Sequence, residues 1–112
     1  MKVFVYGTLK SGHGAEDLMW PGHVLYSKEV SGYRLYTNGG YPMAVPGQRS
    51  DRIVGELWEV PRDNLERLDS YEGHPYLFKR EVVMDGEDEF YMYVYQSDPE
   101  QQGYTRLPDG VF

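Results

Sequence analysis

The chain has 112 residues, no cysteine and a formal net charge of −7. A chain of this length forms a single domain, residues 1–112, and its aromatic content of 15% provides core volume that a disordered chain lacks. The acidic balance argues against binding to nucleic acid or to anionic lipid, and without cysteine no disulfide or thiolate ligand can form.

The first half of the chain predicts strands separated by glycine-rich turns. β-branched and aromatic residues, or alternating polarity, predict extended chain in four segments: residues 2–6, 24–37, 41–47 and 53–60. The first segment is apolar enough for a central strand, whereas the two prolines of the third keep it out of one. Turn residues and a short apolar run predict the connections: a loop over 7–14, a short helix over 15–18, a bend at Gly32 and a turn at 38–40.

The second half predicts one clear helix followed by a hairpin. The helix is expected over residues 61–71, because Pro61 suits a helix start and apolar residues recur at helical spacing. Gly73 is placed to end it. Two strands, 78–84 and 90–95, are expected on either side of an acidic loop. The polar tail after Ser97 is expected to be loosely held.

These elements predict an α+β fold that is mainly β. A small closed or nearly closed barrel suits so short a chain, because closure removes exposed strand edges. The apolar stretch at the start is too short for a signal peptide, and no run of about 20 apolar residues is present to cross a bilayer. The chain is therefore expected in the cytoplasm.

The turn after the first strand is the first candidate for chemistry. Tyr6, Gly7, Thr8 and Leu9 follow a buried-looking strand, and a glycine-rich turn there can aim successive N–H groups into one concavity that binds an anion. The alternative is an ordinary tight turn in which Gly7 serves only its backbone angles. The loop lacks the Lys-Ser/Thr ending of a phosphate-binding loop, so no nucleotide is indicated.

The end of the predicted helix is the second candidate. Glu72 lies four residues after Leu68, so its carboxylate leans toward the buried side of the helix. Burial and the negative end of the helix dipole would both raise its pKa toward neutrality, which suits a general base. The alternative is an exposed glutamate of the last turn.

Other polar and aromatic groups indicate no further site. The three histidines, at positions 13, 23 and 74, have no metal-binding spacing, so neither a metal nor a cofactor is expected. Tyr91, Tyr93 and Tyr95 fit one packed face of a strand better than a base-stacking platform, because such platforms lie in basic grooves.

Four motifs occur together in an order that resembles the gamma-glutamylcyclotransferase-like family, which includes gamma-glutamylamine cyclotransferases and AIG2-like proteins. A strand leads into Tyr-Gly-Thr-Leu at residues 6–9, and a helix ends in Leu-Asp-Ser-Tyr-Glu-Gly at 68–73 with an arginine, Arg80, before the next strand. Gly-Tyr-Pro at 40–42 and Val-Gly-Glu-Leu-Trp at 54–58 also resemble family segments. The resemblance extends from Val3 to about Tyr95.

The resemblance implies a fold, a reaction and a set of site residues. The fold would be a small mixed β-barrel flanked by short helices. The reaction would convert a γ-glutamyl amine or γ-glutamyl amino-acid derivative to 5-oxoproline, with Glu72 as general base and acid. The substrate loop would be Tyr6, Gly7, Thr8 and Leu9. Phe78 stands where many relatives have a tyrosine. By resemblance, Tyr76 would then supply the hydroxyl contact in its place, and Arg80 would be a further substrate-binding residue.

Two other functions remain open from the sequence. The chain could be a non-catalytic module that binds a small carboxylate, or a β-barrel that binds another protein through its tyrosine stripe. The binding module predicts saturable ligand binding without product, and the protein-binding barrel predicts an exposed tyrosine stripe with Glu72 pointing to solvent. The sequence does not specify the leaving amine or the oligomeric state.

Overall fold

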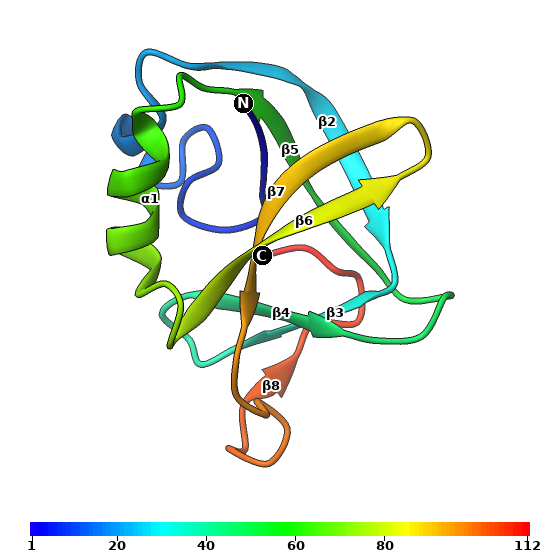
Figure 1. Cartoon of the computed structure of the whole chain (residues 1–112). Helices are drawn as coiled ribbons and strands as arrows, with labels where there is room; N and C mark the ends of the chain where they lie inside the picture. The colour runs from blue at the N-terminus through cyan, green and yellow to red at the C-terminus, as the bar shows by residue number, and fades with distance from the viewer.

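A computed structural model describes residues 1–112 and contains eight strands, one α-helix and one short 3-10 helix (Figure 1). In chain order they are β1 (Lys2–Val5), the 3-10 helix (Glu16–Met19), β2 (His23–Ser31), β3 (Tyr33–Thr37), β4 (Pro42–Pro46), β5 (Arg52–Glu59), α1 (Asn64–Glu72), β6 (Phe78–Asp85), β7 (Asp88–Tyr95) and β8 (Thr105–Arg106). Neither helix is long and apolar enough to cross a membrane.

The larger sheet has five strands in the order β2-β5-β1-β7-β6. β1 lies at its centre, antiparallel to β5 and parallel to β7, which confirms the prediction of a central first strand. Its side chains alternate between two clusters of buried residues. Val3 and Val5 pack in the cluster that contains Leu68 of α1, whereas Phe4 belongs to a second cluster with Leu35 of β3.

The smaller sheet has the order β4-β3-β8. β4 begins at Pro42 and ends at Pro46 and pairs only with β3, as predicted from prolines that cannot donate to a second neighbour. Gly32 separates β2 from β3 at a φ of 91°, so the expected bend divides one extended segment between two sheets.

The fold is mainly β with few helices, as predicted, but the prediction of a barrel is wrong because neither sheet closes on itself. β2 and β6 remain unpaired edges of the five-stranded sheet. Side chains rather than backbone bonds connect β2 to the β6–β7 hairpin: Lys28 Nζ lies 3.0 Å from Asp85 Oδ2 and 3.1 Å from Asp88 Oδ2.

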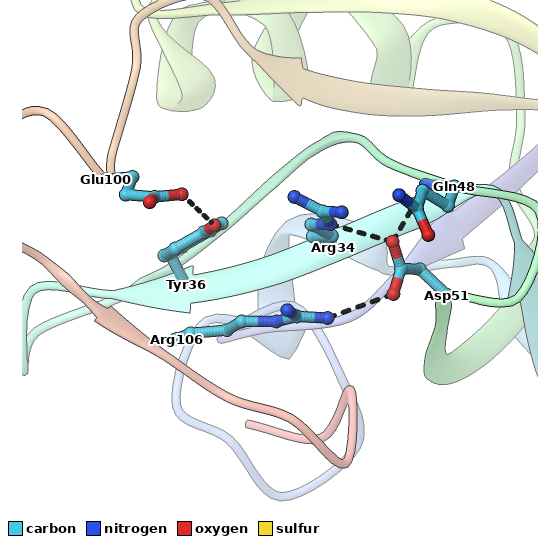
Figure 2. A network of polar contacts seen from close by, with 6 residues as sticks. All are labelled: Arg34, Tyr36, Gln48, Asp51, Glu100 and Arg106. Atoms are coloured by element: carbon cyan, nitrogen blue, oxygen red, sulfur yellow. Dashed lines mark hydrogen bonds and ion pairs between the residues drawn. The ribbon is translucent and has the colours of Figure 1, made fainter.

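The helix and the tail differ from the sequence expectations in their extent. α1 begins at Asn64 rather than Pro61, and ends as expected at Gly73, which has a φ of 67°. The tail is not loosely held. β8 pairs with β3, and Arg34 Nε and Arg106 Nη2 approach the Asp51 carboxylate at 2.7 and 2.9 Å (Figure 2).

Candidate active site

A cavity of about 260 Å³ lies at the end of β1, between the first loop and the last turn of α1. Its lining comes from segments far apart in the sequence: residues 4–9, 41–42, 71–72 and 77–78, with Tyr93. The two stretches that the sequence singled out therefore meet at one cavity. The parallel pairing of β1 with β7 and the packing of Leu68 under the sheet hold them there.

The first loop presents unpaired backbone donors. The N–H groups of Gly7, Thr8 and Leu9 donate to no acceptor within the protein, and all three residues line the cavity. Three successive free amides beside a cavity can bind a carboxylate or a developing oxyanion.

Gly7 is required by close approach rather than by its backbone angles. Its φ is not positive, but a Cβ atom there would lie 2.6 Å from Cγ of Pro42. Pro42 begins β4, so the absence of a side chain lets the loop pack against the smaller sheet. The sequence indicated a glycine-dependent turn without revealing this contact.

Glu72 is the last residue of α1, is half-buried and lines the cavity. Burial raises its pKa from 4.5 to about 7, because the charged carboxylate loses solvation. Gly73 turns the chain away immediately afterwards in the left-handed conformation. A carboxyl group with this pKa can accept and return a proton near neutral pH.

Tyr6 and Leu9 form the inner part of the same wall. Tyr6 is buried, donates its hydroxyl hydrogen to the Tyr93 carbonyl and accepts a bond from the Ala44 N–H at 3.4 Å. Burial and the negative charge of Glu72 raise the pKa of Tyr6 well above 10, so its hydroxyl stays neutral. Leu9 is buried in the cluster that contains Leu68.

Tyr76 and Arg80 do not line the cavity. The Tyr76 side chain is 88% exposed. Arg80 Nε lies 2.9 Å from Asp69 Oδ1, and its guanidinium stacks 4.7 Å from the centre of the Tyr91 ring. Arg80 thus contacts the residue three positions before Glu72 and not the cavity itself.

The structure adds site residues that the sequence reasoning missed. Tyr71, Leu77, Tyr41, Pro42 and Tyr93 all line the cavity. The Tyr71 hydroxyl lies 2.7 Å from Thr8 Oγ1, which links the helix end to the loop. Three of the five, Tyr41, Pro42 and Tyr71, belong to family-like motifs and could have been found. Tyr93 was noted only as part of the packed strand face, and Leu77 gave no signal.

The chemistry of the site is that of one carboxyl group facing backbone amides. No cluster of three or more His, Asp or Glu side chains could hold a metal ion. Of the three histidines, His13 and His23 are exposed, and Nδ1 of His74 accepts a hydrogen bond from the Arg80 N–H at 2.9 Å. The arrangement can therefore support proton transfer and oxyanion binding.

The family model "Gamma-glutamyl cyclotransferase, AIG2-like" matches residues 3–112. The chain belongs to the gamma-glutamylcyclotransferase family. Its function is accordingly that of a gamma-glutamylcyclotransferase-like enzyme acting on a small γ-glutamyl molecule.

Two relatives agree with membership of the gamma-glutamylcyclotransferase family, and a solved structure shares the fold. A gamma-glutamylcyclotransferase family protein, ytfP of Citrobacter rodentium, is 31% identical over 98% of this chain and 93% of its own length. The gamma-glutamylaminecyclotransferase of Bos taurus is 30% identical over 75% of this chain and 57% of its own length. An uncharacterized protein from Pyrococcus horikoshii has the same fold, with a TM-score of 0.85 and 24% identity over 100% of this chain and 89% of that one.

Proposed function

We propose that this enzyme converts a γ-glutamyl amine or a γ-glutamyl amino-acid derivative to 5-oxoproline and releases the amine, with Glu72 as general base and acid. One observation carries the proposal. A half-buried carboxyl group with a pKa of about 7 lines the same cavity as three backbone N–H groups without acceptors.

The attacking nitrogen must lose two protons, one before it attacks and one as the ring amide forms. The substrate's α-ammonium is not nucleophilic until it loses a proton, and ionised Glu72 accepts that proton. The freed amine then attacks the γ-carbonyl carbon and closes a five-membered ring. Protonated Glu72 gives its proton to the departing nitrogen as that nitrogen's bond to the carbonyl carbon breaks. The ring nitrogen loses its second proton to the regenerated carboxylate, which passes it to the released amine, so the amine leaves as an ammonium ion and Glu72 is ionised again.

The first loop supplies binding and charge stabilisation. The amides of Gly7, Thr8 and Leu9 are fixed donors that require no reorganisation during the reaction. They suit the glutamyl α-carboxylate and the carbonyl oxygen that becomes negative during attack. Holding the amine near the carbonyl removes much of the entropic barrier to ring closure.

The two alternative functions are less compatible with the geometry. A module that binds a small carboxylate without an ammonium group gains nothing from a second carboxyl group in its cavity. A protein-binding surface built on the tyrosine stripe would need those rings exposed, but Tyr93 and Tyr95 are 3% and 5% exposed.

The test is to incubate the protein with several γ-glutamyl amines and γ-glutamyl amino acids and to measure 5-oxoproline. We expect turnover by the unaltered protein and a loss of at least about a hundredfold in kcat in Glu72→Gln, which cannot carry the proton. Glu66→Gln, an exposed glutamate on the same helix, is the matched control and should retain turnover. Full activity in Glu72→Gln would exclude the assigned role, and saturable binding without product would support the binding module.

A further inference from the structure

The residues that line the cavity connect into a ring with two chemically different arcs. Along one arc, Thr8 Oγ1 lies 2.7 Å from the Tyr71 hydroxyl, and Glu72 follows Tyr71 in the chain. Together with the free loop amides, these groups are the hydrogen-bonding and ionisable part of the ring. We call this the polar arc: Gly7, Thr8, Tyr71 and Glu72.

The other arc is built from apolar and aromatic groups. It runs from Leu77, whose N–H donates to the Gly73 carbonyl at 2.9 Å, through Phe78 to Tyr41, with ring centroids 6.1 Å apart. Pro42 continues it and meets the backbone of Gly7, where a Cβ atom would lie 2.6 Å from its Cγ. We call this the apolar arc: Leu77, Phe78, Tyr41 and Pro42.

Charge is distributed unequally between the arcs. Glu72 is the only charged residue that lines the cavity. If the glutamyl part of a substrate binds as proposed above, its α-ammonium pairs with the Glu72 carboxylate. Its α-carboxylate and γ-carbonyl oxygen accept hydrogen bonds from the loop amides. The charged group and the free amides of the polar arc are then used, the Thr8 and Tyr71 hydroxyls bond to each other, and the apolar arc remains for the departing amine.

The exposure of Leu77 shows where a substrate would extend. Leu77 lines the cavity and is nevertheless 43% exposed, so its side chain lies at the boundary between cavity and solvent. An alkyl or aromatic group that covers this side chain removes apolar surface from water on both molecules. A charged group in the same place finds no charged partner in the lining, because Glu72 is the only charged residue there and is already paired with the α-ammonium.

We propose that this site selects γ-glutamyl substrates whose departing amine is uncharged and apolar, and that Leu77 is the specificity-determining residue of the apolar arc. The inference rests on the proposed cyclotransferase reaction and specifies its substrate class. A departing amine with an ammonium or carboxylate at its far end is the class that the arc disfavours.

Two substrates of matched shape test the selection. The γ-glutamyl amide of hexylamine and the γ-glutamyl amide of cadaverine differ only in a terminal methyl group against a terminal ammonium. We expect kcat/KM to be at least about tenfold higher for the hexylamine derivative, on the scale by which enzymes discriminate small changes in an apolar pocket. Measurement of 5-oxoproline and of the released amine gives both constants.

Variants of Leu77 connect the preference to the apolar arc. Leu77→Glu places a carboxylate beside the terminal group, so we expect the ratio of the two kcat/KM values to move toward the cadaverine derivative. Leu77→Ala should lower kcat/KM for the hexylamine derivative relative to the γ-glutamyl amide of methylamine, which is too short to use the side chain. Leu25→Ala is the matched control and should leave these ratios unchanged, because Leu25 is an exposed leucine on β2 that does not line the cavity.

The outcomes separate this inference from the proposed function. Equal kcat/KM for the hexylamine and cadaverine derivatives would overturn the selection and leave the cyclotransferase activity standing. So would two unchanged ratios: hexylamine to cadaverine in Leu77→Glu, and hexylamine to methylamine in Leu77→Ala. Absence of 5-oxoproline from every γ-glutamyl compound would remove the proposed function itself. If Leu77→Glu does not fold, as judged by circular dichroism, the substrate pair and Leu77→Ala still decide the matter.

Discussion

Glu72 combines a useful pKa with a cost in stability, because the same burial causes both. A carboxyl group whose pKa rises from 4.5 to about 7 on folding keeps its proton in the folded state where the unfolded chain has lost it. Its contribution to the free energy of unfolding therefore falls as pH rises from about 4.5 to about 7, and stays low above that range.

Glu72→Gln should therefore be more stable than the unaltered protein at a pH well above 7, and equally stable near pH 4.5. The shift sets an upper value of about 3 kcal/mol. Solvent in the open cavity reduces it, so we expect about 1–2 kcal/mol. Urea unfolding of both proteins across this pH range measures the difference. An equal gain at every pH would show that Glu72 titrates normally.

Gly7 is the residue whose replacement should separate loop geometry from loop chemistry. Gly7→Ala keeps every backbone amide but places a Cβ atom 2.6 Å from Cγ of Pro42, so the loop must move. We expect about 1–3 kcal/mol less stability, from overpacking, and a lower kcat/KM for 5-oxoproline formation. Gly40→Ala is the control, since its Cβ would meet its nearest neighbour at an ordinary 3.4 Å. Unchanged kinetics in Gly7→Ala would mean that the position of these amides does not matter.

At the scale of elements, the last turn of α1 is attached to the sheet by Asp69. The Tyr93 hydroxyl donates to Asp69 Oδ1 at 2.7 Å, and Arg80 Nε lies 2.9 Å from the same oxygen without the alignment of a hydrogen bond. β6 and β7 thus hold the helix three residues before Glu72. Arg80, a substrate-binding candidate from the sequence, acts in the structure on the position of this turn.

Asp69→Ala should therefore affect catalysis as well as stability. It leaves the Tyr93 hydroxyl and the Arg80 guanidinium without their partner, at a cost of about 2 kcal/mol. Small displacement of Glu72 should lower kcat by roughly ten- to a hundredfold. Ser70→Ala, at an exposed neighbour on the helix, should do neither. A loss of stability with kcat unchanged would restrict Asp69 to a structural role.

The sequence predicted individual elements well where local chemistry decides them. Alternation and β-branched content located every strand except β8, and Gly73 marked the end of α1 because a left-handed residue was needed there. The start of α1 was less accessible: Pro61 can begin a helix, but residues 61–63 form a turn before Asn64. Leu77 was also missed, because one leucine between an exposed tyrosine and a strand has no pattern of its own.

The arrangement of the whole molecule depends on contacts that no local pattern reports. The parallel pairing of β1 with β7 joins residues from opposite ends of the chain, and the barrel expectation failed because pairing stops at the edges β2 and β6. The meeting of the first loop with Glu72 could be inferred only through family resemblance. Its physical cause is long-range: β1 is central, and Leu68 packs beneath it.

The C-terminal tail is a second case in which local sequence did not report a long-range contact. Its polar sequence predicted a loosely held segment, but ion pairs between distant residues attach it to the fold. Asp51 accepts hydrogen bonds from Arg34 of β3, Arg106 of β8 and the Gln48 N–H, and its pKa is lowered from 3.8, chiefly by the bond from Arg34 (Figure 2). A lowered carboxyl pKa means that this attachment is present at neutral pH and is lost only as pH falls below 3.8.

Asp51→Ala should accordingly release the tail without disturbing the cavity. We expect faster amide hydrogen exchange around β8 at neutral pH, because β8 has only two residues and few backbone bonds of its own. Exchange in β1 and β7 should not change, and neither should 5-oxoproline formation, because no tail residue lines the cavity. High salt should weaken the pairs in the unaltered protein and bring its exchange closer to that of the variant. Slow exchange around β8 in Asp51→Ala would instead assign the tail to apolar packing, in which Leu107 contacts the cluster around Leu35.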